Sequence, residues 1–173
     1  MKSVILGLVF LVGTPIFAQS NSARQIADWS MGVISGATGM YAATFNDSGV
    51  AFGNYCYFKT QTCFWVLAIN LRTEENARYP VLINSKKGAF NTVMICESAK
   101  SVGLESRCVF ENPDVISEAV IGSGQIGFAF PLADGKFHVS RFSLAGGDEA
   151  VSSVRELVRR AGKGGTGTRD SRL

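Results

Sequence analysis

The stretch Val50–Leu71, VAFGNYCYFKTQTCFWVLAINL, decides the fold of this chain. Its two ends, Val50 to Phe58 and Cys63 to Leu71, are rich in aromatic and β-branched residues, the composition typical of strands. The residues between Cys56 and Cys63 favour a turn. The stretch therefore predicts two antiparallel strands whose cysteines face each other across a short loop.

The sequence contains four cysteines: Cys56, Cys63, Cys96 and Cys108. An even number in an exported protein indicates a disulfide framework, for which three connectivities are possible. The spacing favours the local pairs Cys56–Cys63 and Cys96–Cys108, each stabilising the fold by about 2–3 kcal/mol in the chain-entropy model. The alternative is a zinc site, but zinc ligands usually occur as close CxxC-type pairs or with histidines nearby. Neither pattern surrounds these cysteines, so no metal is expected.

The same composition predicts further strands along the chain. They cover Met40 to Phe45, Tyr79 to Ile83, Phe90 to Cys96, Gln125 to Pro131 and Phe137 to Phe142. Asn84 to Gly88 has the residues of a hairpin connection. Asp134-Gly135 favours a primed turn, because both residues tolerate positive φ.

Two helices are expected. For the first, Asn112 is the N-cap, Pro113 takes the first helical position and Asp114 lies near the positive helix end. The second runs from about Asp148 to Ala161 with one apolar stripe, and Gly162 is its C-cap. Many strands, few helices and no βαβ alternation predict a mainly β fold: an antiparallel sandwich or barrel with two peripheral helices, stabilised by disulfides.

The N-terminus has the layout of a secretory signal peptide. Met1-Lys2 is positively charged, Val4 to Phe17 is mostly apolar, and Ile16-Phe17-Ala18 offers a small residue at the cut. A membrane anchor would need roughly 20 apolar residues. We therefore predict a signal peptide at 1–18, a single β-rich domain at 19–161 and a disordered basic tail at 162–173. The protein is expected to be periplasmic or secreted, with no stable membrane insertion after cleavage.

The basic residues gather at the C-terminus. From Arg155 onward there are six basic residues against two acidic ones. No aromatic residue alternates with these arginines, so a nucleic-acid partner is not expected. Arg155, Arg159 and Arg160 lie on the predicted last helix. They are candidates for contact with an acidic partner, and Glu156 and Arg160 are spaced to form a modest ion pair.

Several motifs suggest chemistry that their context does not favour. Gly122 to Gly127 and Gly162 to Gly167 match GxGxxG, but nucleotide binding needs a strand before the glycines and a helix after them. His138, the only histidine, would have to be the base of any Ser/His or Cys/His mechanism, and there is no GxSxG motif. No residue is assigned to a catalytic or cofactor site, and the chain is predicted not to be an enzyme.

The C-terminal half resembles the invasion-associated locus B family of exported bacterial proteins. The similarity runs through Tyr79-Pro80-Val81-Leu82, Cys96, Cys108, Gly127-Phe128-Ala129-Phe130 and Phe142-Ser143-Leu144-Ala145-Gly146-Gly147, with Ala150 and Leu157 in the closing helix. The resemblance implies an envelope-associated or secreted protein linked to host-cell colonisation, with a β-rich fold and no known catalytic residues.

The function expected from these observations is binding. The export signal, the disulfides and the lack of a catalytic set favour an exported, non-enzymatic bacterial protein with a protein partner. Three alternatives stay open: an inhibitor or immunity protein against a secreted toxin or hydrolase, a small exported hydrolase built from distant residues such as His138 with Asp134 or Asp148, and a component of a secretion assembly. The sequence sets no oligomeric state.

Overall fold

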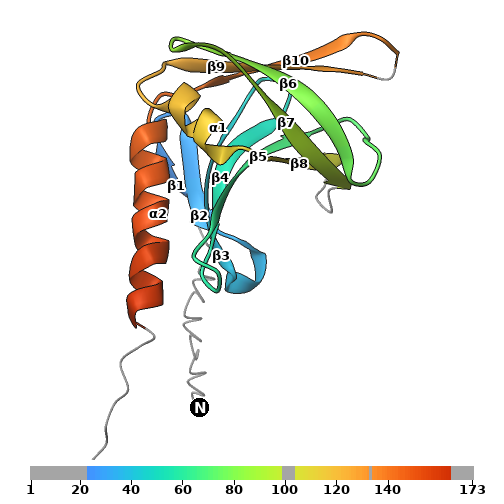
Figure 1. Cartoon of the computed structure of the whole chain (residues 1–173). Helices are drawn as coiled ribbons and strands as arrows, with labels where there is room; N and C mark the ends of the chain where they lie inside the picture. The colour runs from blue at the N-terminus through green and yellow to red at the C-terminus, as the bar shows by residue number, and fades with distance from the viewer. Residues whose placement is uncertain (1–22, 99–103, 133, 165–173) are drawn as a thin grey trace, which may run out of the picture.

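A computed structural model describes residues 23–98, 104–132 and 134–164 (Figure 1). The predicted signal peptide and the tail beyond residue 164 lie outside these residues. The described chain forms one antiparallel sheet of ten strands, in the order β1-β2-β3-β4-β5-β8-β7-β6-β9-β10, with two α-helices.

The strands are β1 (Arg24–Ile26), β2 (Trp29–Val33), β3 (Gly39–Phe45), β4 (Ala51–Tyr57), β5 (Cys63–Ile69), β6 (Ala77–Ser85), β7 (Gly88–Ser98), β8 (Ser106–Phe110), β9 (Gln125–Pro131) and β10 (Phe137–Ser143). The helices are α1 (Pro113–Val120) and α2 (Gly147–Gly164), and a short 3-10 turn covers Ser35–Ala37. The predicted β9 and α1 are confirmed at these positions, and Asn112 caps α1 by accepting from the N–H groups of Asp114 and Val115.

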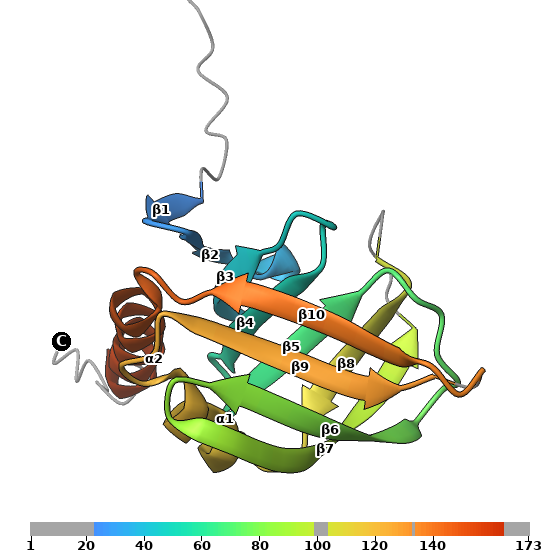
Figure 2. The same cartoon turned by 90° about the horizontal axis from the view of Figure 1, so that it is seen from above.

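The sheet curls so that its inner face encloses the core. β9 and β10 cross over β4 and β5 (Figure 2), and Phe52 of β4 meets aromatic rings from both sides of the curl. Its ring centroid lies 5.1 Å from that of Trp65, 4.9 Å from that of Phe128 and 5.6 Å from that of Phe142. All four rings are buried, and such close aromatic packing dominates core energetics.

The two ends of the sheet meet near Trp29. Its indole Nε1 donates to the carbonyl oxygen of Ser143 at 3.2 Å, and the backbone N–H of Asp28 donates to Ala145 at 3.2 Å. The curled sheet is thus closed at one end, as in a barrel. The expected mainly β antiparallel fold with two helices and two disulfides is confirmed.

Both local disulfides are confirmed. Cys56 and Cys63 face each other across β4 and β5, and Cys96 and Cys108 face each other across β7 and β8. In each pair the Cα atoms lie 4.0 Å apart. Directly opposed residues of an antiparallel pair are the closest positions in a sheet, which explains why spacing alone identified the partners.

Two details differ from the sequence prediction. The hairpin between β9 and β10 has a five-residue loop, because Pro131 pairs with Phe137, and of the predicted primed turn only the positive φ of Gly135, 80°, is seen. The helix α2 continues to Gly164, so Gly162 is not its C-cap. A side chain at Gly162 would meet the Gln61 amide, with its Cβ 1.8 Å from Nε2. Gly162 therefore lies within the helix, directly against the Gln61 side chain.

Candidate binding site

A hollow of about 860 Å³ lies on the outer face of the sheet, over β3, β4, β5 and β8. It is built by the residues that alternate with those of the core. In β4, Phe52, Asn54 and Cys56 are buried in the inner face, whereas Tyr55 and Tyr57 point outward and are half-buried. The pleat of the strands thus separates the core from this outer surface.

A stacked tyrosine pair forms one wall of the hollow. Tyr41 and Tyr55 are direct partners across β3 and β4, and their rings stack with centroids 5.7 Å apart and planes 23° apart. Gly32 of β2 makes room for this stack, because a Cβ there would lie 2.7 Å from the Tyr41 hydroxyl. Burial raises the pKa of the Tyr55 hydroxyl, so this group stays neutral and available as a hydrogen-bond donor.

A charged pair also lines the hollow. Arg107 of β8 and Glu97 of β7 are direct partners, and the Arg107 Nε donates to Glu97 Oε1 at 2.8 Å. The ion pair remains accessible, with side-chain exposures of 44% and 41%. Arg107 thereby presents a fixed guanidinium beside the tyrosine pair.

The rim of the hollow combines apolar and polar groups. Val33 is 44% exposed, and Ile34 and Leu104 complete its apolar part. Glu75 closes the polar side and accepts from the backbone N–H of Ser98 at 3.0 Å. Aromatic residues and arginine are enriched at protein interfaces, where tyrosine and arginine often carry most of the binding energy. The hollow therefore combines residue types that are enriched at protein interfaces.

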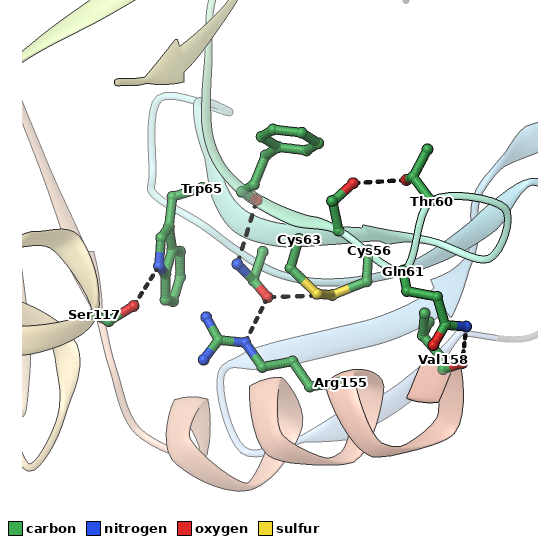
Figure 3. Close-up of a disulfide and its surroundings, with 11 residues drawn as sticks. Cys56, Thr60, Gln61, Cys63, Trp65, Ser117, Arg155 and Val158 are labelled. Carbon is green, nitrogen blue, oxygen red and sulfur yellow. Dashed lines mark hydrogen bonds between the residues drawn. A yellow bond between two sulfur atoms is a disulfide. The ribbon is translucent and has the colours of Figure 1, made fainter. Parts of the chain in front are cut away.

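The structure separates the three arginines predicted for partner contact. Arg155 remains partly exposed but contacts the sheet: its Nε donates to Asn54 Oδ1 at 3.1 Å, and its guanidinium lies 5.8 Å from the Trp65 ring centroid (Figure 3). Burial lowers the pKa of Arg155. This side chain connects α2 to β4 and β5, and it lies close to the Cys56–Cys63 disulfide.

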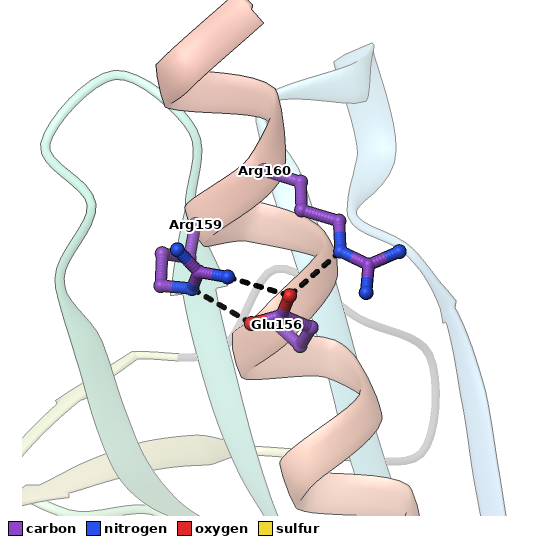
Figure 4. Close-up of polar contacts among 3 residues, drawn as sticks. All are labelled: Glu156, Arg159 and Arg160. Atoms are coloured by element: carbon purple, nitrogen blue, oxygen red, sulfur yellow. Dashed lines mark hydrogen bonds and ion pairs between the residues drawn. The ribbon is translucent and has the colours of Figure 1, made fainter.

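The other two arginines share one carboxylate on the surface of α2. Glu156 accepts from Arg159 Nε at 2.7 Å and from Arg160 Nε at 2.6 Å (Figure 4). These hydrogen bonds lower the pKa of Glu156 to about 2. The expected pair of Glu156 and Arg160 is present, and a role of Arg159 and Arg160 in partner contact stays a prediction.

His138 has a structural partner. The half-buried ring lies with its Nε2 2.9 Å from Ser140 Oγ and packs on Phe130, with centroids 5.1 Å apart. Burial lowers the pKa of His138. Asp134 forms an ion pair with Lys136, and Asp148 accepts from Gly122, so within the described ranges neither aspartate hydrogen-bonds His138. His138 does not line the hollow.

No group of three or more His, Cys, Asp or Glu side chains among the described residues is arranged to hold a metal ion. Within the same residues, none of the helices has the length and apolar character needed to span a membrane.

Sequence reasoning missed the hollow. The signal was present in the alternation of Val50 to Tyr57, where tyrosines occupy the positions between the core residues. The residues that complete the site come from distant segments, however, and only the strand register shows that Tyr41 and Arg107 lie over the same face.

The fold is similar to that of a protein of known structure. No protein-family model matches the chain, and no curated protein matches its sequence. The crystal structure of invasion associated protein B from Bartonella henselae has a similar fold, with a TM-score of 0.59 and 12% sequence identity. The match covers 80% of this chain and 99% of that one. The name of this solved protein refers to invasion. Its similar fold agrees with the β-rich fold that the family resemblance of the C-terminal half implies.

Proposed function

We propose that this chain is an exported, non-enzymatic bacterial protein that binds another protein through the hollow formed by Tyr41, Tyr55 and Arg107. The observation that carries the proposal is the stacked tyrosine pair beside a fixed arginine on an open face. The Tyr41 ring lies closely against Gly32 and stacks on Tyr55, and Arg107 is held by Glu97. Little side-chain freedom would be lost when a partner docks, which favours affinity.

The setting proposed for this binding is the bacterial envelope or the host surface. It rests on the expected signal peptide, the two disulfides and the similarity in fold to a protein named for invasion. Disulfides persist in oxidising compartments such as the periplasm and the extracellular space. We further propose a role in host colonisation, which the name of the protein of similar fold supports.

The test uses two matched arginines. Arg107 and Arg78 are both surface residues in ion pairs with a glutamate, but only Arg107 borders the hollow. A photo-crosslinking residue at Val33, on the rim, is used to capture partners from envelope and host-cell extracts. We expect one partner to be captured, its yield to fall at least tenfold with Arg107→Ala and to be unchanged with Arg78→Ala.

One further variant, with two substitutions, distinguishes the hollow from the surface of α2. The double change Arg159→Ala and Arg160→Ala tests the helix contact predicted from the sequence. Equal capture by the wild type and Arg107→Ala would overturn the assignment to the hollow. Loss of capture only with the helix variant would instead place the interface on α2.

A further inference from the structure

The strand β10 ends the sheet with an open edge. The other end strand, β1, has only three residues, whereas β10 has seven. The end of β10 near Ser143 is covered by Trp29, which binds its carbonyl. Among the described residues, no strand pairs with β10 along its outer edge from Phe137 to Arg141.

The hydrogen bonds to β9 show which residues face this edge. Leu132 donates to Lys136, and Leu144 donates to Gly124, at the two ends of the pair. Because antiparallel pairs alternate between bonded and non-bonded positions, the even-numbered residues of β10 bond to β9. Phe137, Val139 and Arg141 therefore direct their N–H and C=O groups away from the sheet. The carbonyl of Ser143, which Trp29 binds, has the same direction.

Of the three side chains along this edge, Phe137 and Val139 are apolar and exposed, and Arg141 is an exposed charge. Phe137 is 62% exposed and Val139 is 49% exposed, and both point to the outer face. Val139 continues a row through Ala129 of β9 to Leu82 of β6, which is 56% exposed. This row lines a shallow groove of about 360 Å³. Edge strands of monomeric proteins usually carry charges, prolines or bulges that prevent such exposure.

We propose that β10 pairs with β10 of a second copy of this chain, antiparallel and with the two-fold axis at Val139. The edge is self-complementary in this register. Phe137 would face the partner's Arg141, so each end of the pair would join a ring and a guanidinium. Val139 would face the partner's Val139, and the apolar row would run on through both copies. Like charges would not oppose each other, and every edge-facing group from 137 to 141 would find a backbone partner.

Cysteine cross-linking tests the register. Residues in a hydrogen-bonded antiparallel pair have Cα atoms roughly 5.5 Å apart, within the range that a disulfide can span. The four native cysteines are already paired. We expect Val139→Cys to form a covalent dimer by itself under mild oxidation. Phe137→Cys alone should stay monomeric. A mixture of Phe137→Cys and Arg141→Cys should form a covalent dimer. Phe45→Cys, at an exposed position of β3, is the control.

Sedimentation measures the association without a cross-link. A single strand pair buries little area, so the dimer is expected to be reversible and to increase with protein concentration. Val139→Lys would place two like charges at the axis and should leave only monomer, whereas Phe45→Lys should not change the profile. A wild-type protein that stays monomeric at every accessible concentration would overturn the proposal. The proposed register would also be overturned if Phe137→Cys cross-linked to itself and Val139→Cys did not.

Discussion

Arg155 of α2 and Asn54 of β4 are joined by a hydrogen bond of 3.1 Å, although 101 residues separate them in the sequence. Asn54 is fully buried, and its Nδ2 donates to the carbonyl of Phe64 at 3.3 Å. A second link lies nearby, where Gln61 Nε2 donates to the carbonyl of Val158 at 3.1 Å. The last helix is thus attached to the disulfide-linked strands by specific polar contacts as well as by its apolar face.

Loss of the Arg155 side chain should destabilise the fold. In Arg155→Ala the oxygen of the buried Asn54 would lose its charged donor and Trp65 would lose a guanidinium contact, which we expect to cost about 1–3 kcal/mol. Arg160→Ala is the control, because surface ion pairs contribute at most about 1 kcal/mol. Urea denaturation gives the free energy of unfolding of each variant relative to the wild type. Equal stabilities of the two variants would contradict a structural role for Arg155.

The two disulfides should contribute similar energies but couple differently to Arg155. Replacing either pair by serines is expected to cost about 2–3 kcal/mol. Asn54 Oδ1 contacts both Arg155 and the Sγ of Cys56, at 3.1 and 3.4 Å. Effects of residues that share a partner are not additive. Combining Arg155→Ala with loss of Cys56–Cys63 should therefore deviate from the sum of the single effects, whereas combining it with loss of Cys96–Cys108 should be additive. The free energies of unfolding of the wild type, the single variants and the combined variants, measured with a denaturant, give the coupling energy in a double-mutant cycle.

Elements with strong local signals could be predicted from the sequence. The cap at Asn112 and the alternation of Gln125 to Pro131 identified α1 and β9. β2 was missed because Gly32 weakens its strand pattern, and the reason for that glycine is the Tyr41 ring, nine residues later. The site needs more than local pattern. Arg107 reaches the tyrosines only because β8 pairs with β5, a connection between distant segments that no turn residue specifies.

Gly53 should not accept a side chain. It lies in the middle of β4, where a Cβ would be 2.4 Å from the carbonyl oxygen of Ala42 and 2.7 Å from the Ala43 Cβ. Gly53→Ala would push β3 and β4 apart, and we expect a loss of about 1–3 kcal/mol, as for other overpacked sites. Gly124→Ala is the control, because nothing lies within 4 Å of a Cβ at that position. Similar thermal unfolding of both variants would show that β3 and β4 can separate without cost.

His138 should make stability depend on pH in one defined window. In the unfolded chain its pKa is about 6.5, and burial lowers the pKa in the folded protein. As the pH falls through about 6.5, the unfolded state therefore takes up the proton first, and the free energy of unfolding decreases. The decrease ends once the pH is below the folded pKa, and above the unfolded value His138 is neutral in both states.

The comparison of wild type with His138→Gln isolates this contribution, because the carboxylates titrate in both proteins. Relative to the variant, the wild type should lose stability as the pH is lowered from neutral, and the difference should become constant at lower pH. The single histidine also gives one ring signal whose NMR titration reports the folded pKa directly. Parallel stability curves for the two proteins, or a folded pKa at or above 6.5, would contradict the lowered pKa. Because His138 lies outside the hollow, the same variant should retain the partner binding that Arg107→Ala removes.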